Sequence, residues 1–235
     1  MIIIGLTGGI ASGKSTTAGL FRDRGIPVHD ADAAVHEMMA AGGLAVDPVV
    51  DAFGRDVLAP DGSIDRQRLG GEVFAAPARR QLLESIIHPR VGAARDSFLE
   101  AQRQARTPLV VLDIPLLFET GGETLCDFVI LCSVDPETQR QRALARHGMT
   151  EDKLDAILQT QMPLATKRAM ADAVIETGHG VAAARDALQA LLDGPVRDLR
   201  DNDNRAGRTG DGPNGDGPNG DEPNGDEPGG DGRDA

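Results

Sequence analysis

Four short apolar runs alternate with helix-type segments along the first 196 residues, and a fifth candidate follows them. The runs are MIIIGLT (1–7), IPVHD (26–30), PLVVLDI (108–114), DFVILCSV (127–134) and the candidate DAVIET (172–177). Runs of this kind are typical of strands that are buried on both faces. Their alternation with helices predicts a parallel sheet between two helical layers, a three-layer α/β/α architecture.

Two long segments do not fit a simple strand–helix–strand crossover. Residues 32–107 show helical periodicity and turn signals such as APDGS, but no strong strand pattern. We expect them to form a helical lobe over the carboxyl end of the sheet, where open α/β sheets bind ligands. Residues 136–171 are helix-rich and carry many arginines, so we expect a helical lid there.

Composition separates the end of the chain from the rest. The total charge is −13, and residues 201–235 hold ten acidic side chains against three arginines, a charge of −7 that leaves −6 elsewhere. From residue 209 a GDGPN-like unit repeats with almost no apolar side chains, so we expect 197–235 to be a disordered acidic tail apart from a folded domain at 1–196. A calcium-binding repeat is disfavoured by the proline in each unit.

The same composition limits the classes of partner. An acidic body argues against a general nucleic-acid binder. No run reaches the length of a membrane span, and the N-terminus lacks the pattern of a signal peptide. We therefore expect a cytoplasmic protein, a monomer or weak homo-oligomer, that binds neither nucleic acid nor membrane.

The segment GGIASGKS follows the first run directly and contains Gly8, four intervening residues, then Gly13, Lys14 and Ser15. This is the spacing of a phosphate-binding loop, here called the phosphate loop, between a strand and a helix. Backbone N–H groups can converge on phosphate oxygens there, while the lysine neutralises the outer phosphates and the serine ligates Mg²⁺. The sequence therefore predicts ATP and Mg²⁺ bound by Gly8, Ala11, Ser12, Gly13, Lys14, Ser15 and Thr16.

Other sequence features narrow the class of phosphate-loop protein. The guanine-selective NKxD stretch of switch GTPases is absent from the sequence. A motor or helicase would need a nucleic-acid surface, whereas a small-molecule kinase needs an acceptor site and a lid that excludes water. We expect the last class.

Three further positions could complete such a site. Asp30 ends the second run and Asp32 follows it. Either could orient an acceptor hydroxyl, although Asp32 could equally cap a helix. Asp113 lies near the end of the third run, directly after four apolar residues, and could hold Mg²⁺ through water. The alternative is that it is a solvent-exposed aspartate at the end of a strand.

Basic residues mark the expected lid and lobe. We expect a helix between Pro136 and Gly148. Arg142 and Arg146 are four residues apart in it, so they should lie on the same side of the helix and could bind phosphate there. The alternative is that this side is only a solvated, arginine-rich face. His88 precedes a proline and should sit at a break in the helical lobe.

These residues together resemble the dephospho-coenzyme A kinase family. The resemblance rests on GLTGGIASGKST, the aspartate after the second run, IHPRV, DIPLLFE, the paired lid arginines and QMPLATKRAMADAVI, in this order. It implies ATP-dependent phosphorylation of the ribose 3′-hydroxyl of dephospho-coenzyme A, the last step of coenzyme A synthesis. The alternatives are another small-molecule or nucleotide kinase, or a nucleotide-binding regulatory protein without turnover.

The resemblance also assigns roles to particular residues. It implies that Asp32, Lys14 and Arg142 are catalytic, that Arg146 contacts the nucleotide, and that Lys167 and Arg168 lie near it. The substrate-binding residues that it implies are Asp32, His88, Pro89, Arg90, Leu116, Leu117 and Glu119. Two departures concern the nucleotide: Thr177 stands where the family commonly has Asn, and Ala11 where it commonly has Gly, a change that should be tolerated if φ is negative.

Overall fold

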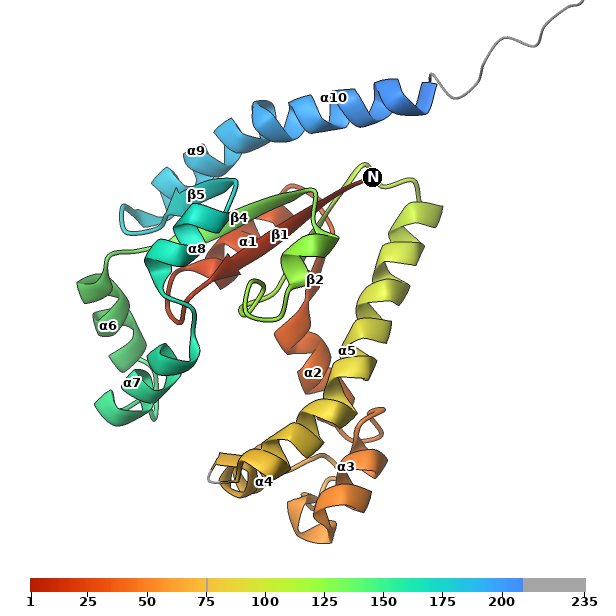
Figure 1. Ribbon diagram of the computed structural model, residues 1–235, viewed down its shortest axis with the longest axis vertical. Helices are drawn as coiled ribbons and strands as arrows, with labels where there is room; N and C mark the ends of the chain where they lie inside the picture. The colour runs from red at the N-terminus through yellow and green to blue at the C-terminus, as the bar shows by residue number, and fades with distance from the viewer. Residues whose placement is uncertain (75, 209–235) are drawn as a thin grey trace, which may run out of the picture.

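A computed structural model describes residues 1–74 and 76–208. At its centre is a five-stranded sheet in the order β2-β3-β1-β4-β5, with every neighbouring pair parallel (Figure 1). The strands are β1 (Ile2–Gly8), β2 (Val28–Asp30), β3 (Leu109–Asp113), β4 (Phe128–Ser133) and β5 (Ala173–Glu176). Each overlaps one of the apolar runs, so the predicted parallel α/β sheet is confirmed.

Helices cover both faces of this sheet. On one face Leu6 and Ile130 pack with Phe21 of α1 (Lys14–Arg22) and Leu188 of α9 (Gly180–Asp193). On the other face β3 packs against Leu99 of α5 (Pro77–Gln104). Full burial of one such side chain stabilises the fold by roughly 1.5–3 kcal/mol, so the three layers hold the carboxyl ends of the strands rigidly.

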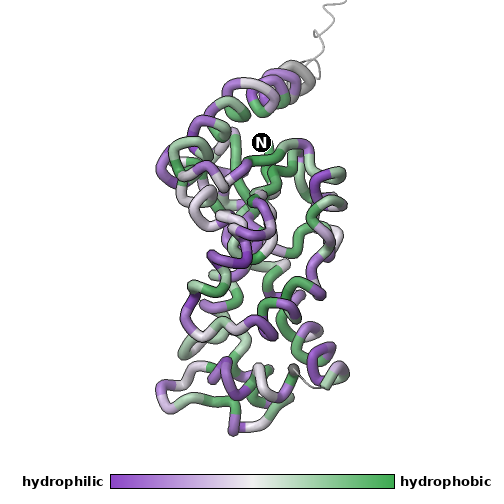
Figure 2. The backbone as a smooth tube through the Cα atoms, turned by 90° about the vertical axis from the view of Figure 1, so that its left-hand side faces the viewer, coloured by the Kyte–Doolittle hydropathy of each residue, from purple (hydrophilic) through white to green (hydrophobic). Residues whose placement is uncertain are grey.

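A helical lobe lies beside the carboxyl end of the sheet, as Figure 1 shows. It contains α2 (Ala31–Met39), α3 (Val46–Phe53), the 3₁₀ turn η1 (Arg55–Val57), α4 (Arg66–Phe74) and the first half of α5. The lobe has a core of its own, which includes Met38, Val49, Phe53, Leu69 and Ile87. Figure 2 shows hydrophobic and hydrophilic residues alternating along the outer helices, as expected for helices that bury one side.

The expected break at His88 is wrong, because α5 continues through Pro89. A proline inside a helix removes one backbone hydrogen bond. Around it, Arg90 donates through Nη1 to the Ile86 carbonyl at 2.6 Å, and Ile87 is anchored in the lobe core. These contacts hold the helix together across the proline.

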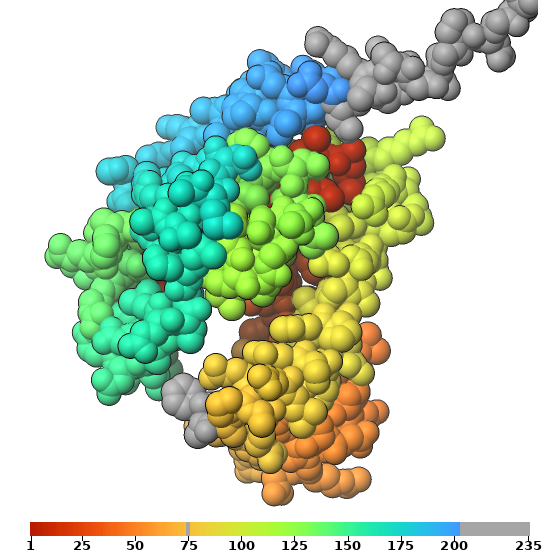
Figure 3. Space-filling view, in the orientation of Figure 1, coloured from red at the N-terminus to blue at the C-terminus, as the bar shows by residue number. Residues whose placement is uncertain are grey.

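The lid contains α6 (Pro136–Leu144), α7 (Glu151–Thr160) and α8 (Leu164–Met170). Asp135 caps α6 and Thr150 caps α7 through their side-chain oxygens. Arg140 pairs with Glu151 and Asp155 across the two helices. The space-filling view shows the molecule hollowed between this lid and the helical lobe (Figure 3).

Beyond the sheet, η2 (Gly122–Leu125) precedes β4, and α10 (Pro195–Arg208) follows α9. The expectation of disorder from residue 197 is therefore wrong for 197–208, since Val196 is fully buried and Leu199 packs against the main core. The expectation for 209–235 lies outside the described residues. Among the described helices, none combines the length and apolar character that a bilayer crossing requires.

Candidate active site

The phosphate loop joins β1 to α1, and two of its residues have a left-handed backbone conformation. Ala11 has φ +58° and Gly13 has φ +85°. A Cβ at Gly13 would also lie 2.8 Å from the side chain of Thr177, so only glycine fits there. The first turn of α1 has no side-chain cap and no acidic residue, which leaves its N–H groups and its dipole for an anion.

Ala11 does not meet the condition set from the sequence, because its φ is positive. For a residue with a Cβ, the left-handed region costs roughly 1–2 kcal/mol. Its methyl group is buried with Ala143 and Leu154 of the lid, and Ile10 and Leu144 pack against them. This apolar contact offsets the strain and places the lid directly on the phosphate loop.

Lys14 and Asp113 form an ion pair at the centre of the site. Lys14 Nζ lies 2.5 Å from Asp113 Oδ1, and the Asp113 side chain is only 1% exposed. The solvent-exposed alternative for Asp113 is therefore wrong. Burial raises the pKa of Asp113 above its ordinary value of 3.8, and the attraction of Lys14 only partly opposes it.

The oxygen ligands near this ion pair could complete a Mg²⁺ site only together with phosphate. Within the described residues no group of three or more His, Cys, Asp or Glu side chains could hold a metal. Ser15 is exposed and lines a cavity that is formed mainly by the phosphate loop, and Asp113 supplies a carboxylate. Both residues offer oxygen ligands of the kind that Mg²⁺ prefers. Phosphate oxygens and water would have to complete the six ligands, as in kinase sites.

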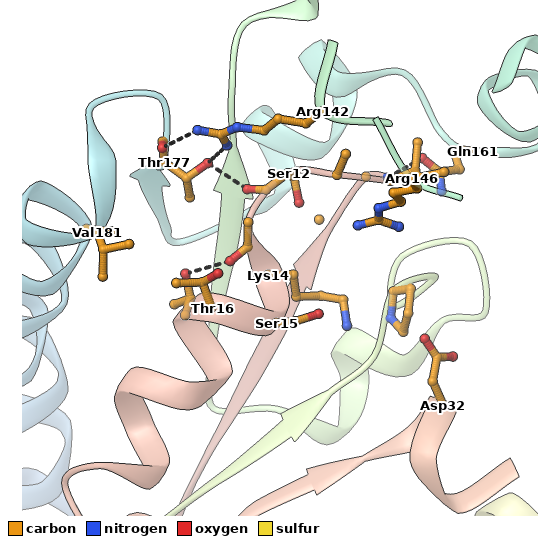
Figure 4. Close-up of a pocket in the computed structure, with 18 of the residues that line it drawn as sticks. Ser12, Lys14, Ser15, Thr16, Asp32, Arg142, Arg146, Gln161, Thr177 and Val181 are labelled. Carbon is orange, nitrogen blue, oxygen red and sulfur yellow. Dashed lines mark hydrogen bonds between the residues drawn. The ribbon is translucent and has the colours of Figure 1, made fainter. Parts of the chain in front are cut away.

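The two aspartates after β2 have different positions. Asp30 is the N-cap of α2 and accepts from the Ala33 N–H at 3.0 Å. Asp32 lies in the first turn of that helix, so the alternative that made Asp32 the cap is wrong. Asp32 is exposed and lines the cavity, and Figure 4 shows its carboxylate pointing toward the cavity that holds Lys14.

The lid arginines are separated. α6 ends at Leu144, so Arg146 lies beyond the helix and the expected shared helical side is wrong. Arg142 donates to the Thr177 hydroxyl at 3.2 Å and to the Thr177 carbonyl at 3.0 Å. Both arginines line the cavity, with Arg142 beside Thr177 and Arg146 nearer Gln161 (Figure 4).

Thr177 connects three parts of the site, which the sequence did not reveal. Its hydroxyl donates to the Ser12 carbonyl at 2.7 Å and lies 3.2 Å from the Ser133 carbonyl. It thus links the phosphate loop, β4 and Arg142. The sequence flagged this position only as a departure from the family, because contacts 165 residues apart leave no local signal.

Two glutamines of the lid also hold the phosphate loop and were missed. Gln139 donates to the Ile10 carbonyl at 2.8 Å, and Gln161 accepts from the Ile10 N–H at 3.3 Å. A Cβ on Gly9 would lie 2.9 Å from Gln139 and 3.1 Å from Gln161. The lid therefore packs against backbone where only glycine leaves room.

The lobe residues implied for the acceptor lie outside the lining of this cavity. His88 and Pro89 are exposed on α5. Arg90 is half-buried and donates to the Leu44 carbonyl at 3.2 Å, in addition to its bond to Ile86. Among the lobe residues that the structure describes, Asp32 alone lines this cavity.

The segment after β3 is divided between surface and core. Leu116 is 39% exposed, whereas Leu117 is fully buried against Phe118 and Val129. The prediction that Leu117 contacts the acceptor directly is therefore wrong for this structure. Glu119 pairs with Lys167, and Arg168 pairs with Glu176. The expected position of Lys167 and Arg168 near the nucleotide stays a prediction.

The cavity formed by these residues has a volume of about 370 Å³. It is lined by the phosphate loop from Gly8 to Thr17, by Asp32, Pro115, Arg142, Arg146, Gln161, Thr177, Gly180, Val181 and Ala184. One end is rich in N–H groups and cations, and the other carries the carboxylate of Asp32. The cavity can therefore hold a polyphosphate and present its end to a neutral hydroxyl.

Residues 2–182 match the family model described as Dephospho-CoA kinase. The chain belongs to the dephospho-CoA kinase family. A dephospho-CoA kinase of Mesorhizobium japonicum is 50% identical over 193 residues, which cover 82% of this chain and 96% of the relative. One of Bradyrhizobium diazoefficiens is 47% identical over 82% of this chain and 94% of the relative.

Two solved structures share the fold of this chain. The crystal structure of TT1252 from Thermus thermophilus has 35% identity and a TM-score of 0.70, covering 83% of this chain and 97% of that chain. A dephospho-CoA kinase from Campylobacter jejuni has 22% identity and a TM-score of 0.59, covering 81% of this chain and 95% of that chain. The latter likeness shows the fold alone.

Proposed function

We propose that this chain transfers the terminal phosphate of ATP to the ribose 3′-hydroxyl of dephospho-coenzyme A, giving coenzyme A and ADP in the final step of coenzyme A synthesis. The observation that carries the proposal is the placement of Lys14 and Asp32 in one cavity. A cation at the phosphate loop and a carboxylate across from it are the groups that phosphoryl transfer to an alcohol requires. Family membership supports the identity of the acceptor.

The phosphate end of the cavity supplies positive potential. The N–H groups of the first turn of α1 and the Lys14 ammonium would bind the phosphate oxygens, and Lys14 would exchange its present contact with Asp113 for one with phosphate. The buried Ser12 hydroxyl has no partner among the described residues, so it is free to donate to an oxygen. These groups stabilise charge that develops during transfer.

Mg²⁺, held by Ser15 and through water by Asp113, would neutralise charge on the phosphate oxygens. The raised pKa of Asp113 makes a nearby cation useful for keeping this carboxylate ionised. Both residues lie where α1 and β3 meet, which is the correct edge of the sheet for such a role.

At the other end, Asp32 would accept a hydrogen bond from the acceptor hydroxyl and orient it toward the phosphate. An ordinary aspartate is a weak base toward an alcohol, so orientation comes first and proton transfer late. Arg146 would contact the transferring phosphate from the lid side, and Arg142 would hold the nucleotide end beside Thr177. Closure of the lid would exclude water from the transfer.

The proposal is tested by incubating the protein with Mg·ATP and, separately, dephospho-coenzyme A, adenosine, AMP and shikimate, while ADP release is followed. We expect turnover with dephospho-coenzyme A alone and a product that carries one more phosphate by mass spectrometry. Turnover with another acceptor would favour a different small-molecule kinase. Nucleotide binding without turnover on any acceptor would favour a regulatory protein.

A further inference from the structure

Lys167 is the most deeply buried charged group of the lid. It lies on α8 with 1% exposure, next to a second cavity lined in part by Gly9, Ser12 and Gln161 behind the phosphate loop. An ammonium removed from water costs several kcal/mol unless a partner of opposite charge and good geometry compensates. The chain has only three lysines among 24 basic residues, so a lysine at this position is conspicuous.

The compensating partner is Glu119, in the segment that follows β3. Lys167 Nζ lies 2.8 Å from Glu119 Oε1 and 3.5 Å from the carbonyl oxygen of Pro115. Burial raises the pKa of Glu119, but the hydrogen bonds from Lys167 and from the Met162 N–H more than offset this and leave the pKa below its ordinary value. Glu119 is therefore a carboxylate paired with a buried cation.

Glu119 joins two segments that each contribute a residue to the lining of the main cavity. Its Oε1 accepts from the Met162 N–H at 2.8 Å. Met162 directly follows Gln161, which lines the main cavity and accepts from the Ile10 N–H. The other end of the connection is Pro115, which lines the same cavity together with Asp32.

The Pro115 carbonyl oxygen is held twice. Thr7 of β1 donates to it through its hydroxyl at 3.0 Å, and Lys167 approaches it from the lid. Pro115 is two residues beyond Asp113, so its position is set jointly by the sheet and by the buried ion pair. A shift of this carbonyl by an ångström would move the wall of the cavity beside Asp32.

We propose that Lys167 is a positioning residue for the acceptor: with Glu119 it fixes residues 114–119 against the base of the lid, so that the cavity wall at Pro115 has one defined position beside Asp32. This rests on the proposed function. Glu119 then acts through Lys167 and Met162 and does not contact the acceptor, which differs from the role that the family resemblance implied. The Leu117 side chain in the same segment supports the arrangement from the core.

The test compares two lysine-to-methionine substitutions in the full chain. Lys167→Met removes the buried charge at similar side-chain length. Lys153→Met makes the same change at an exposed lysine of α7 whose ammonium group donates to the Gly148 carbonyl. We expect Lys167→Met to raise KM for dephospho-coenzyme A about tenfold with less than threefold change in KM for ATP, and Lys153→Met to match the unmodified chain. Equal changes in both KM values, or none, would overturn the proposal.

A second variant keeps the test decisive if Lys167→Met folds poorly. Glu119→Gln retains an oxygen that can accept from Met162 and lacks the charge, so the double variant Lys167→Met/Glu119→Gln leaves no unpaired buried ion. We expect the double variant to recover the melting temperature while KM for dephospho-coenzyme A stays raised. Recovery of both would show that the pair serves stability alone and would refute the positioning role. The unmodified chain must turn over dephospho-coenzyme A in the same assay, and its failure to do so would refute the proposed function instead.

Discussion

The hydroxyl of Thr177 lies 2.7 Å from the carbonyl oxygen of Ser12, across 165 residues of sequence. The same residue receives both guanidinium contacts of Arg142. The phosphate loop and Arg142 are therefore positioned by one residue that directly follows β5. Nucleotide binding should depend on it more than acceptor binding does.

Thr177→Val tests this dependence, because it keeps the shape of the side chain and removes the hydroxyl. Loss of the three hydroxyl contacts at about 1 kcal/mol each should lower kcat/KM for ATP by up to about 10²-fold. KM for dephospho-coenzyme A should change much less. Steady-state kinetics with each substrate varied in turn measure the two effects.

Thr160→Val is a matched control at an exposed threonine of the lid, where the hydroxyl bonds only locally to the Ile157 carbonyl. Its kinetics should equal those of the unmodified chain. A similar loss in both variants would show that Thr177 has no special connection with the nucleotide.

Lys14→Ala should lower kcat by at least ~10²-fold, since it removes one preorganised charge from the phosphate end of the cavity. It also leaves Asp113 buried at 1% exposure without its cation. Single-turnover measurements at saturating Mg·ATP separate the loss in transfer from any loss in binding. Near-normal turnover would contradict the assignment of the phosphate loop.

The raised pKa of Asp113 gives a prediction on stability and pH. Since the folded chain binds this proton more tightly than the unfolded chain, ionisation of Asp113 destabilises the fold as the pH rises from the ordinary pKa of 3.8 toward the higher folded value. Asp113→Asn cannot ionise, so its free energy of unfolding relative to the unmodified chain should increase between pH 4 and pH 7. Urea unfolding at several pH values measures the difference, and a constant difference would show that the shift is absent.

Local sequence patterns predicted the sheet and the phosphate loop because both depend on residues close together in the chain. Burial on both faces produces the apolar strands, and the spacing from Gly8 to Ser15 is itself a local pattern of glycines, a lysine and a serine. Family resemblance gave Asp32 its role. The structure adds that Asp30 takes the helix cap.

The predictions that failed depended on contacts between distant segments. Arg142 and Arg146 do not share a helical side because α6 ends at Leu144. His88 is not at a break because the lobe core and Arg90 keep α5 continuous through Pro89. No local pattern distinguishes Leu117, which is buried, from Leu116, which is not. Their difference comes from the packing of the segment after β3.

Asp30, the N-cap of α2, and Asp32, in the first turn of α2, should respond differently to substitution. Asp30→Ala removes the helix cap and should lower the free energy of unfolding by about 1 kcal/mol. Asp32→Ala should leave stability nearly unchanged and lower kcat by ~10²- to 10⁴-fold, because the acceptor hydroxyl loses its orienting group. Denaturant unfolding and initial rates on both variants make the comparison, and equal losses of stability would contradict the separate roles.

The strain at Ala11 leads to a prediction about the contact between lid and phosphate loop. Ala11→Val places a β-branched residue at φ +58° in a buried cluster with Ala143 and Leu154, so it should destabilise the fold by at least ~2 kcal/mol. Ala11→Gly relieves the left-handed strain but loses a buried methyl worth about 0.8 kcal/mol, so its melting temperature should remain close to that of the unmodified chain. Because the methyl is also part of the lid contact, KM for ATP should rise two- to threefold in the glycine variant. A valine variant as stable as the glycine variant would mean that the backbone at Ala11 leaves the left-handed region in solution.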